Sequence, residues 1–122
     1  MESLPFYCDD YTKVLRIFDK MYNIQPDTAK YFKSMKKLFI SFRIDDVIMR
    51  LVYFTKDKEI LVEFGVLYSI EEYDDAEYPY ETHSQMTLHQ YQLAGTLLKQ
   101  FSEIFEEISK GEQKWAIFTR MM

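Results

Sequence analysis

The chain has 122 residues and a mass of 14.8 kDa, which is enough for one compact domain and too little for two. Its composition, 48% hydrophobic and 17% aromatic with only three Gly and three Pro, is typical of an ordered globular protein. Three widely spaced glycines exclude the glycine-rich phosphate-binding loops of the common nucleotide enzymes. We therefore expect residues 1–122 to form a single globular domain.

The cysteine content and the N-terminus indicate the compartment. One cysteine, Cys8, excludes an internal disulfide and a zinc site of paired thiolates, and it fits a reducing environment. The first ten residues lack the pattern of a signal peptide, and no apolar run approaches the roughly 20 residues of a membrane helix. We expect a cytoplasmic protein without membrane association.

The first predicted element is a helix that begins after Asp10 and continues to Asn23. Asp10 is a good N-cap residue, and the apolar side chains that recur at helical spacing are Val14, Leu15, Phe18, Met21 and Tyr22. The Gln25-Pro26-Asp27 stretch should end this helix. A short helical turn that contains Tyr31 and Phe32 is expected next.

Three strands should follow, because apolar residues now alternate with the period of a half-buried strand. They are expected over residues 36–45, 47–54 and 60–70, joined by short turns into an antiparallel meander. Gly65, inside the third strand, indicates a bulge or a place where another group packs closely. The sheet face away from the helices should carry Met49, Leu51, Tyr53, Leu61 and Leu67. Such an apolar face is either covered or a contact surface.

The second half of the chain predicts a long loop, a long helix and a last strand. Residues 71–86 should be irregular because of charge repulsion and Pro79. Thr87 and Gln90 match a capping box for a helix that should end at Gly111. The apolar stripe of this helix consists of Leu88, Tyr91, Ala94, Leu97, Leu98, Phe101, Ile104, Phe105 and Ile108. Residues 114–120 are expected to form a short final strand.

Together these elements predict an α+β fold. It should be a single two-layer domain whose mainly antiparallel sheet has about four strands. The expected order along the chain is α-β-β-β-α-β, with the helices packed on one face of the sheet.

Charge is distributed unequally along the chain. Residues 1–58 carry eleven basic and eight acidic side chains, whereas residues 59–122 carry four basic and twelve acidic ones. The net charge of −5 argues against nonspecific binding to nucleic acid. Six of the acids fall within residues 71–81, which contain three tyrosines and no basic residue. This acidic run is the most distinctive feature of the sequence.

Carboxylates mixed with tyrosines suit recognition of a basic protein. The acids supply the potential that steers such a partner, and the rings add contact area at little entropic cost. We therefore predict a partner-binding site formed by Glu71, Glu72, Tyr73, Asp74, Asp75, Glu77, Tyr78, Tyr80 and Glu81. The alternative is that the run is only a solvated loop that keeps the protein soluble.

Other candidates for chemistry are weaker. His83 and His89 would need a third ligand for a metal site, so we expect neither a metal ion nor a cofactor. Cys8 lies in no motif of a catalytic nucleophile, and a partly buried small side chain is the better interpretation. The lysines at positions 30, 33, 36 and 37 are too few to predict binding of nucleic acid. We therefore expect a protein that is not an enzyme.

In size, acidity and absence of a catalytic motif the chain resembles small immunity proteins and phage-encoded inhibitors that neutralise a toxin or a defence enzyme. This resemblance covers general character and no specific residues. It implies an inhibitor or antitoxin that docks the acidic run onto the basic site of a nuclease or another nucleic-acid-binding enzyme. Two alternatives remain open: a small-ligand-binding or catalytic domain with an aromatic pocket, and a dimeric chaperone for an exported protein. A homodimer is also left open.

Overall fold

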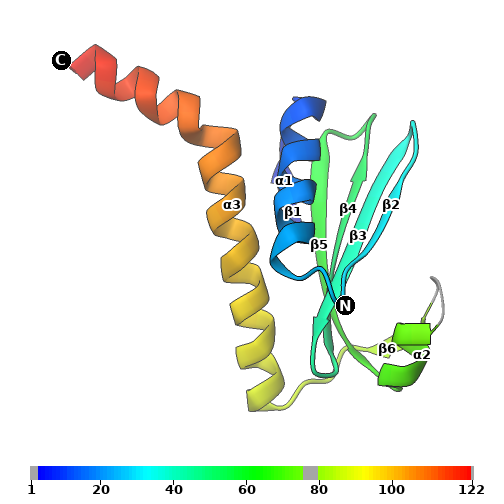
Figure 1. The fold of residues 1–122 in the computed structure, drawn as a ribbon. Coiled ribbons are helices and arrows are strands. Elements are labelled where there is room, and N and C mark those ends of the chain that lie inside the picture. Colours follow the sequence, from blue (N-terminus) through cyan, green and yellow to red (C-terminus); the bar gives the residue numbers. More distant parts are fainter. Residues whose placement is uncertain (1–2, 76–79, 122) are drawn as a thin grey trace.

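The computed structural model describes the backbone of residues 3–75 and 80–121 and the side chains of residues 6–75 and 80–109. Four consecutive strands, β2 to β5, follow the first strand and helix, and two helices with a short strand between them complete the described chain (Figure 1). In order they are β1 (Ser3–Tyr7), α1 (Tyr11–Ile24), β2 (Lys30–Lys33), β3 (Lys37–Ile44), β4 (Val47–Phe54), β5 (Glu59–Leu67), α2 (Ile70–Asp75), β6 (Thr82–His83) and α3 (Leu88–Met121). The predicted α+β class is confirmed.

One antiparallel sheet contains all the described strands. Its order is β1-β5-β4-β3-β2, and β6 pairs with β5 beyond the end of β1. The β3, β4 and β5 meander forms the centre, where Ile40 lies opposite Leu51 and Leu51 opposite Val62. Residues directly opposite each other share a face of the sheet. This register therefore fixes which side chains point toward the helices.

The main core lies between this face and helices α1 and α3, which cover it together (Figure 1). Its buried side chains include Val14, Ile17, Phe18 and Met21 from α1, Leu38, Ile40, Phe42, Met49, Leu51, Tyr53, Ile60 and Val62 from the sheet, and Leu97, Phe101, Ile104 and Ile108 from α3. Each helix buries most of its predicted apolar stripe, but Tyr22 of α1 and Leu88 and Tyr91 of α3 are exposed. A surface ion pair between Lys20 and Glu107, 3.0 Å apart, also joins the two helices.

Both predicted helix caps are confirmed. The Asp10 carboxylate accepts hydrogen bonds from the amides of Thr12 and Lys13, at 3.0 and 3.4 Å. At the start of α3, the Thr87 amide donates to the Gln90 side chain at 2.8 Å. The Gln90 amide returns a bond to the Thr87 hydroxyl at 3.2 Å, which completes the capping box.

Several elements differ from the predicted order. β1 was not expected, and the helical turn predicted around Tyr31 and Phe32 is instead strand β2. The final strand predicted at residues 114–120 is wrong, because α3 continues as a helix to Met121. Gly111 does not end α3, since one glycine costs a helix only about 1 kcal/mol.

The predicted sides of β4 are also wrong. Met49, Leu51 and Tyr53 point toward the helices, because the register pairs them with the core-facing Phe42, Ile40 and Leu38 of β3. The other side of β4 carries Ile48, Arg50, Val52 and Phe54. We call the sheet face away from α1 and α3 the open face. Leu61 and Leu67 lie on it, as predicted.

Gly65 marks a close contact, one of the two alternatives that the sequence left open. A Cβ atom at Gly65 would lie 3.0 Å from Cβ and 3.1 Å from Oγ1 of Thr82 on β6. Gly65→Ala should therefore lower the free energy of unfolding by about 1–2 kcal/mol, measured by urea denaturation, because Thr82 must shift.

Gly95 is the matched control, because a Cβ there meets nothing within 4 Å. Gly95→Ala should raise the free energy of unfolding by about 0.5–1 kcal/mol, since α3 gains helix propensity. A stabilising effect of Gly65→Ala would show that β6 does not pack against β5 as described.

Candidate functional site

The acidic run begins with a short helix, α2, that the sequence did not predict. Ser69 starts it, because its hydroxyl accepts a hydrogen bond from the Glu72 amide at 3.1 Å. Tyr73 then points inward and is fully buried against the open face. Its hydroxyl donates to the main-chain oxygen of Thr28 at 2.8 Å and lies 3.2 Å from Oγ of Ser41. Since Tyr73 has a single hydroxyl proton, Ser41 donates the second bond.

Tyr73 is an anchor and not a contact residue of the predicted kind. Burial raises the pKa of its phenol well above the usual value, so the hydroxyl stays protonated and keeps its bond to Thr28. Tyr80 is also buried, and its ring packs edge to face on Tyr73 with centroids 4.9 Å apart. Ile48 and Leu67 complete this second, smaller core. The two rings hold α2 against the sheet.

A bidentate ion pair fixes the other side of α2. Arg43 on β3 donates from Nε to Oδ1 of Asp74 at 3.0 Å and from Nη2 to Oδ2 at 2.9 Å. The hydrogen bonds from Arg43 hold the pKa of this carboxyl below its usual value. Asp74 is therefore committed to Arg43, and the remaining carboxylates of α2 are those available to a partner.

Asp46 gathers three segments at the same end of the molecule. Its main-chain oxygen accepts a hydrogen bond from the Leu67 amide at 2.8 Å, at the end of β5. Its carboxylate accepts a bond from Nε2 of Gln90 at 2.9 Å, at the start of α3. The β3–β4 turn, α2 with β6, and the start of α3 therefore share one end of the sheet (Figure 1).

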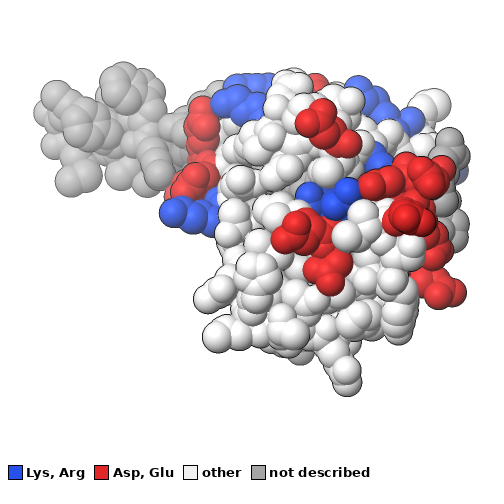
Figure 2. Space-filling model, turned by 60° about the horizontal axis from the view of Figure 1, so that its bottom comes forward, with Lys and Arg blue, Asp and Glu red and all other residues white. Residues whose placement is uncertain are grey.

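We call the exposed carboxylates at this end the acidic end: Asp45, Glu71, Glu72, Asp75 and Glu81. Figure 2 brings this end forward and shows Asp and Glu at the right and near the centre of the view, with Lys or Arg between them and a broad uncharged surface below. Four of these five residues belong to the predicted site, whereas Asp45 was not part of it. Two other predicted residues, Glu77 and Tyr78, lie outside the described residues.

Among the described residues, the exposed rings at this end are not those that the sequence predicted. Tyr68 is 67% exposed just after β5, and its ring lies 4.8 Å from that of His83. Tyr91 and Leu88, in the first turns of α3, are 61% and 76% exposed. Both had been assigned to the buried stripe of α3. The first buried residue that α3 contributes to the main core is Ala94, which follows both of them.

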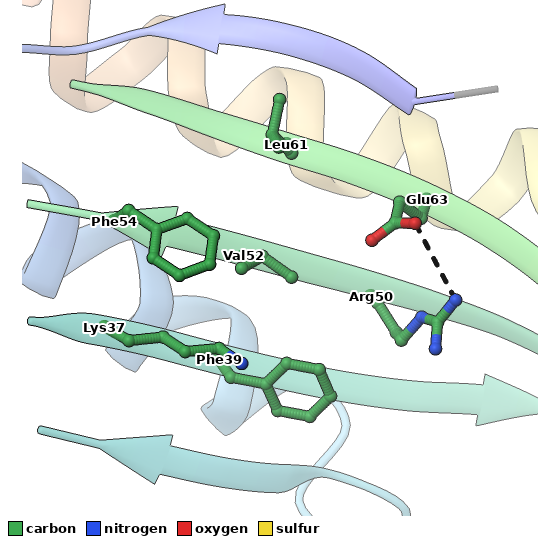
Figure 3. A pocket seen from close by; sticks show the side chains of 7 residues that line it. All are labelled: Lys37, Phe39, Arg50, Val52, Phe54, Leu61 and Glu63. Atoms are coloured by element: carbon green, nitrogen blue, oxygen red, sulfur yellow. Dashed lines mark ion pairs between the residues drawn. The ribbon is translucent and has the colours of Figure 1, made fainter. Parts of the chain in front are cut away.

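A second feature is a groove of about 230 Å³ on the open face (Figure 3). Its floor consists of three apolar side chains that lie side by side on adjacent strands: Phe39, Val52 and Leu61. Lys37 and Phe54 form one end, and Arg50 and Glu63 form the other. We call this feature the open-face groove. The aromatic pocket considered from the sequence was expected between helix and sheet, whereas this groove lies on the opposite face.

The remaining candidates from the sequence are a metal site at the histidines, Cys8 and the lysines at positions 30, 33, 36 and 37. The described residues include no group of three or more His, Cys, Asp or Glu side chains that could hold a metal ion. Cys8 is buried, as predicted, and burial raises the pKa of its thiol, which disfavours a nucleophilic thiolate. The ammonium groups of Lys30, Lys33 and Lys37 lie over aromatic rings of the protein itself, at 4.9–5.6 Å from the ring centroids.

Comparisons with protein-family models, curated proteins and solved structures found no match for this chain. Within the part of the chain that the structure describes, no helix combines the length and the apolar character needed to cross a membrane. The functional argument therefore rests on the acidic end and the open-face groove.

Proposed function

We propose that this protein is a non-catalytic cytoplasmic inhibitor that binds a basic partner protein through the acidic end. The observation that supports the proposal is the placement of five exposed carboxylates on anchored elements next to exposed aromatic rings. Because Tyr73 and Asp74 anchor the backbone of α2, its exposed carboxylates keep a fixed arrangement of backbone positions. Together the carboxylates of the acidic end attract a basic surface over several ångströms. Tyr68 and Tyr91 add the amphipathic contact area that is typical of interface hot spots.

The partner that fits best is a nucleic-acid-binding enzyme such as a nuclease. Its active-site groove must be basic, because it binds a chain of phosphates. The carboxylates of Glu71, Glu72 and Asp75 would take the place of those phosphates, and the rings of Tyr68 and Tyr91 the place of stacked bases. Binding of this kind blocks the groove without any chemical step. An immunity protein or an antitoxin acts in the same way.

The test replaces three acids of α2 and leaves the fold intact. We expect the variant Glu71→Lys, Glu72→Lys, Asp75→Lys to lose at least 100-fold in affinity, because each exposed carboxylate becomes a repulsive charge. The matched control is Asp19→Lys, Asp57→Lys, Glu103→Lys, which changes the net charge equally at exposed positions outside the acidic end. Circular dichroism should show both variants folded, since none of the six side chains is buried.

The readout is capture of proteins from host lysate at low and moderate salt, followed by an activity assay on the captured enzyme. The wild type and the control should capture the same basic protein and inhibit its action on nucleic acid. The α2 variant should do neither. Equal capture by all three proteins, or a captured partner that is acidic, would contradict the proposal.

A further inference from the structure

Arg50, at one end of the open-face groove, is a mostly buried charged side chain whose hydrogen-bond donors are not fully satisfied. Only 14% of its side chain is exposed, so its guanidinium has lost most of its hydration. The Arg50 Nη2 atom lies 3.8 Å from Oε2 of Glu63, which is too far for a hydrogen bond. The ring of Tyr80 lies under the guanidinium, 5.9 Å from Cζ to the centroid. These two contacts supply charge compensation but no acceptor for its donors.

The buried Nε of Arg50 is the sharpest sign of a missing acceptor. Among the described residues it has no hydrogen-bond partner. A buried donor without an acceptor is costly, and the cost is greater when the group is charged. Arg50 lines the groove beside Glu63 (Figure 3), so an acceptor that enters the groove lies next to the guanidinium.

We propose that the open-face groove binds a small amphipathic carboxylate. The carboxylate accepts hydrogen bonds from Arg50, and the apolar body covers Phe39, Val52 and Leu61. Arginine suits this role because its fork of donors matches a carboxylate in plane and spacing. The volume of about 230 Å³ admits a molecule on the order of eight to ten non-hydrogen atoms, given that a water molecule occupies about 30 Å³.

The charges around the groove favour an anion over a cation. Lys37 and Arg50 are positive and Glu63 is negative, which leaves the groove with a net charge of +1 in a protein of net charge −5. Lys37 lies at the end opposite Arg50, with its ammonium over the rings of Phe39 and Phe54 at 5.5 and 5.6 Å. Its field therefore supports binding, while Arg50 makes the directional contact.

Removing the charge of Glu63 should change the affinity for a carboxylate in the opposite direction to removing the charge of Arg50. The Glu63 carboxylate competes with the ligand for Arg50 and repels the incoming negative charge. Glu63→Gln should therefore raise the affinity for a carboxylate, whereas Arg50→Met should lower it. A groove that bound by apolar contact alone would respond to neither change.

The test uses octanoate as the probe and follows amide chemical shifts of the 122-residue protein during a titration. Octanoate should shift the amides of β3, β4 and β5 around Val52, with a dissociation constant near the millimolar range. Octan-1-ol and octylamine have the same apolar body without the carboxylate, and each should bind at least 5-fold more weakly. Arg50→Met should weaken octanoate at least 10-fold, and Glu63→Gln should strengthen it 2- to 5-fold.

Lys56→Met is the matched control, because it removes one positive charge at an exposed turn outside the groove. It should leave octanoate binding unchanged, as should the α2 charge variant, so that this result is independent of the proposed inhibitor function. Arg50→Met should stay folded, because methionine keeps an unbranched apolar stem at this position and removes the buried charge. The proposal is overturned if octanoate causes no shifts, if octylamine binds as tightly as octanoate, or if Arg50→Met does not change octanoate binding.

Discussion

Tyr73→Ala should lower the free energy of unfolding by about 3–5 kcal/mol, as measured by urea denaturation, because it removes a fully buried aromatic ring. The cavity would open between α2 and the open face, where Ile48 and Tyr80 now pack. The hydroxyl of Ser41, which is fully buried, would also lose its partner. Tyr73→Ala therefore removes a buried ring and a buried hydrogen-bond network together.

Tyr73→Phe separates these two contributions. It keeps the ring and removes only the hydroxyl that joins Thr28 and Ser41, so it should cost about 1–3 kcal/mol. If alanine and phenylalanine cost the same, the ring is not packed as described. The same variants also report on function: Tyr73→Ala should weaken partner binding although every carboxylate is retained, since α2 loses its anchor.

The sequence could not show that Tyr73 is an anchor, and the reason is physical. Six acids within eleven residues indicate repulsion and a loop. That interpretation ignores tertiary partners, because Arg43 neutralises Asp74 from a strand 31 positions earlier in the chain. A helix of six residues is not stable alone, so its formation depends on these long-range contacts. The order of residues shows where the charges lie along the chain, but not which side chains of α2 point toward the sheet and which point toward solvent.

The sheet was predictable where the pattern had one dominant period. The β5 strand alternates clearly, and its two faces were assigned correctly at Leu61 and Leu67. The β4 strand, by contrast, is apolar at seven of its eight positions, so alternation cannot distinguish its faces. Arg50 was the single polar marker of the open face. One polar residue is too little to assign the faces of β4 from the sequence. The register with β3 shows which side chains of β4 lie on each face.

The prediction for the end of α3 was wrong for a related reason. Residues 114–120 alternate aromatic, aliphatic and polar side chains in a way that also fits a strand. Short apolar segments do not distinguish strand from helix by period alone. The helix that precedes them already exists, and extending a helix is easier than nucleating a new element. Residues 114–120 therefore continue α3 as a helix despite their local preference for a strand.

The same stripe of α3 yields the second large effect, at Phe101. Phe101→Ala should lower the free energy of unfolding by about 3–5 kcal/mol, because its ring is fully buried at the centre of the main core. It packs edge to face on Phe6 of β1, with centroids 4.9 Å apart, and it also contacts Phe105. The variant therefore measures how firmly α3 holds the unexpected strand β1.

Leu88→Ala is the matched control for Phe101→Ala, because Leu88 belongs to the same predicted stripe yet is 76% exposed. It should change the free energy of unfolding by less than about 0.5 kcal/mol. A double-mutant cycle of Phe6→Ala with Phe101→Ala should give a coupling of about 0.5–1.5 kcal/mol for the aromatic pair. Zero coupling would show that the Phe6 and Phe101 rings do not pack on each other as described. A large loss at Leu88 would place the contact of α3 with the sheet nearer its N-terminus. In that case Leu88 and Tyr91 would belong to the core and could not serve the acidic end.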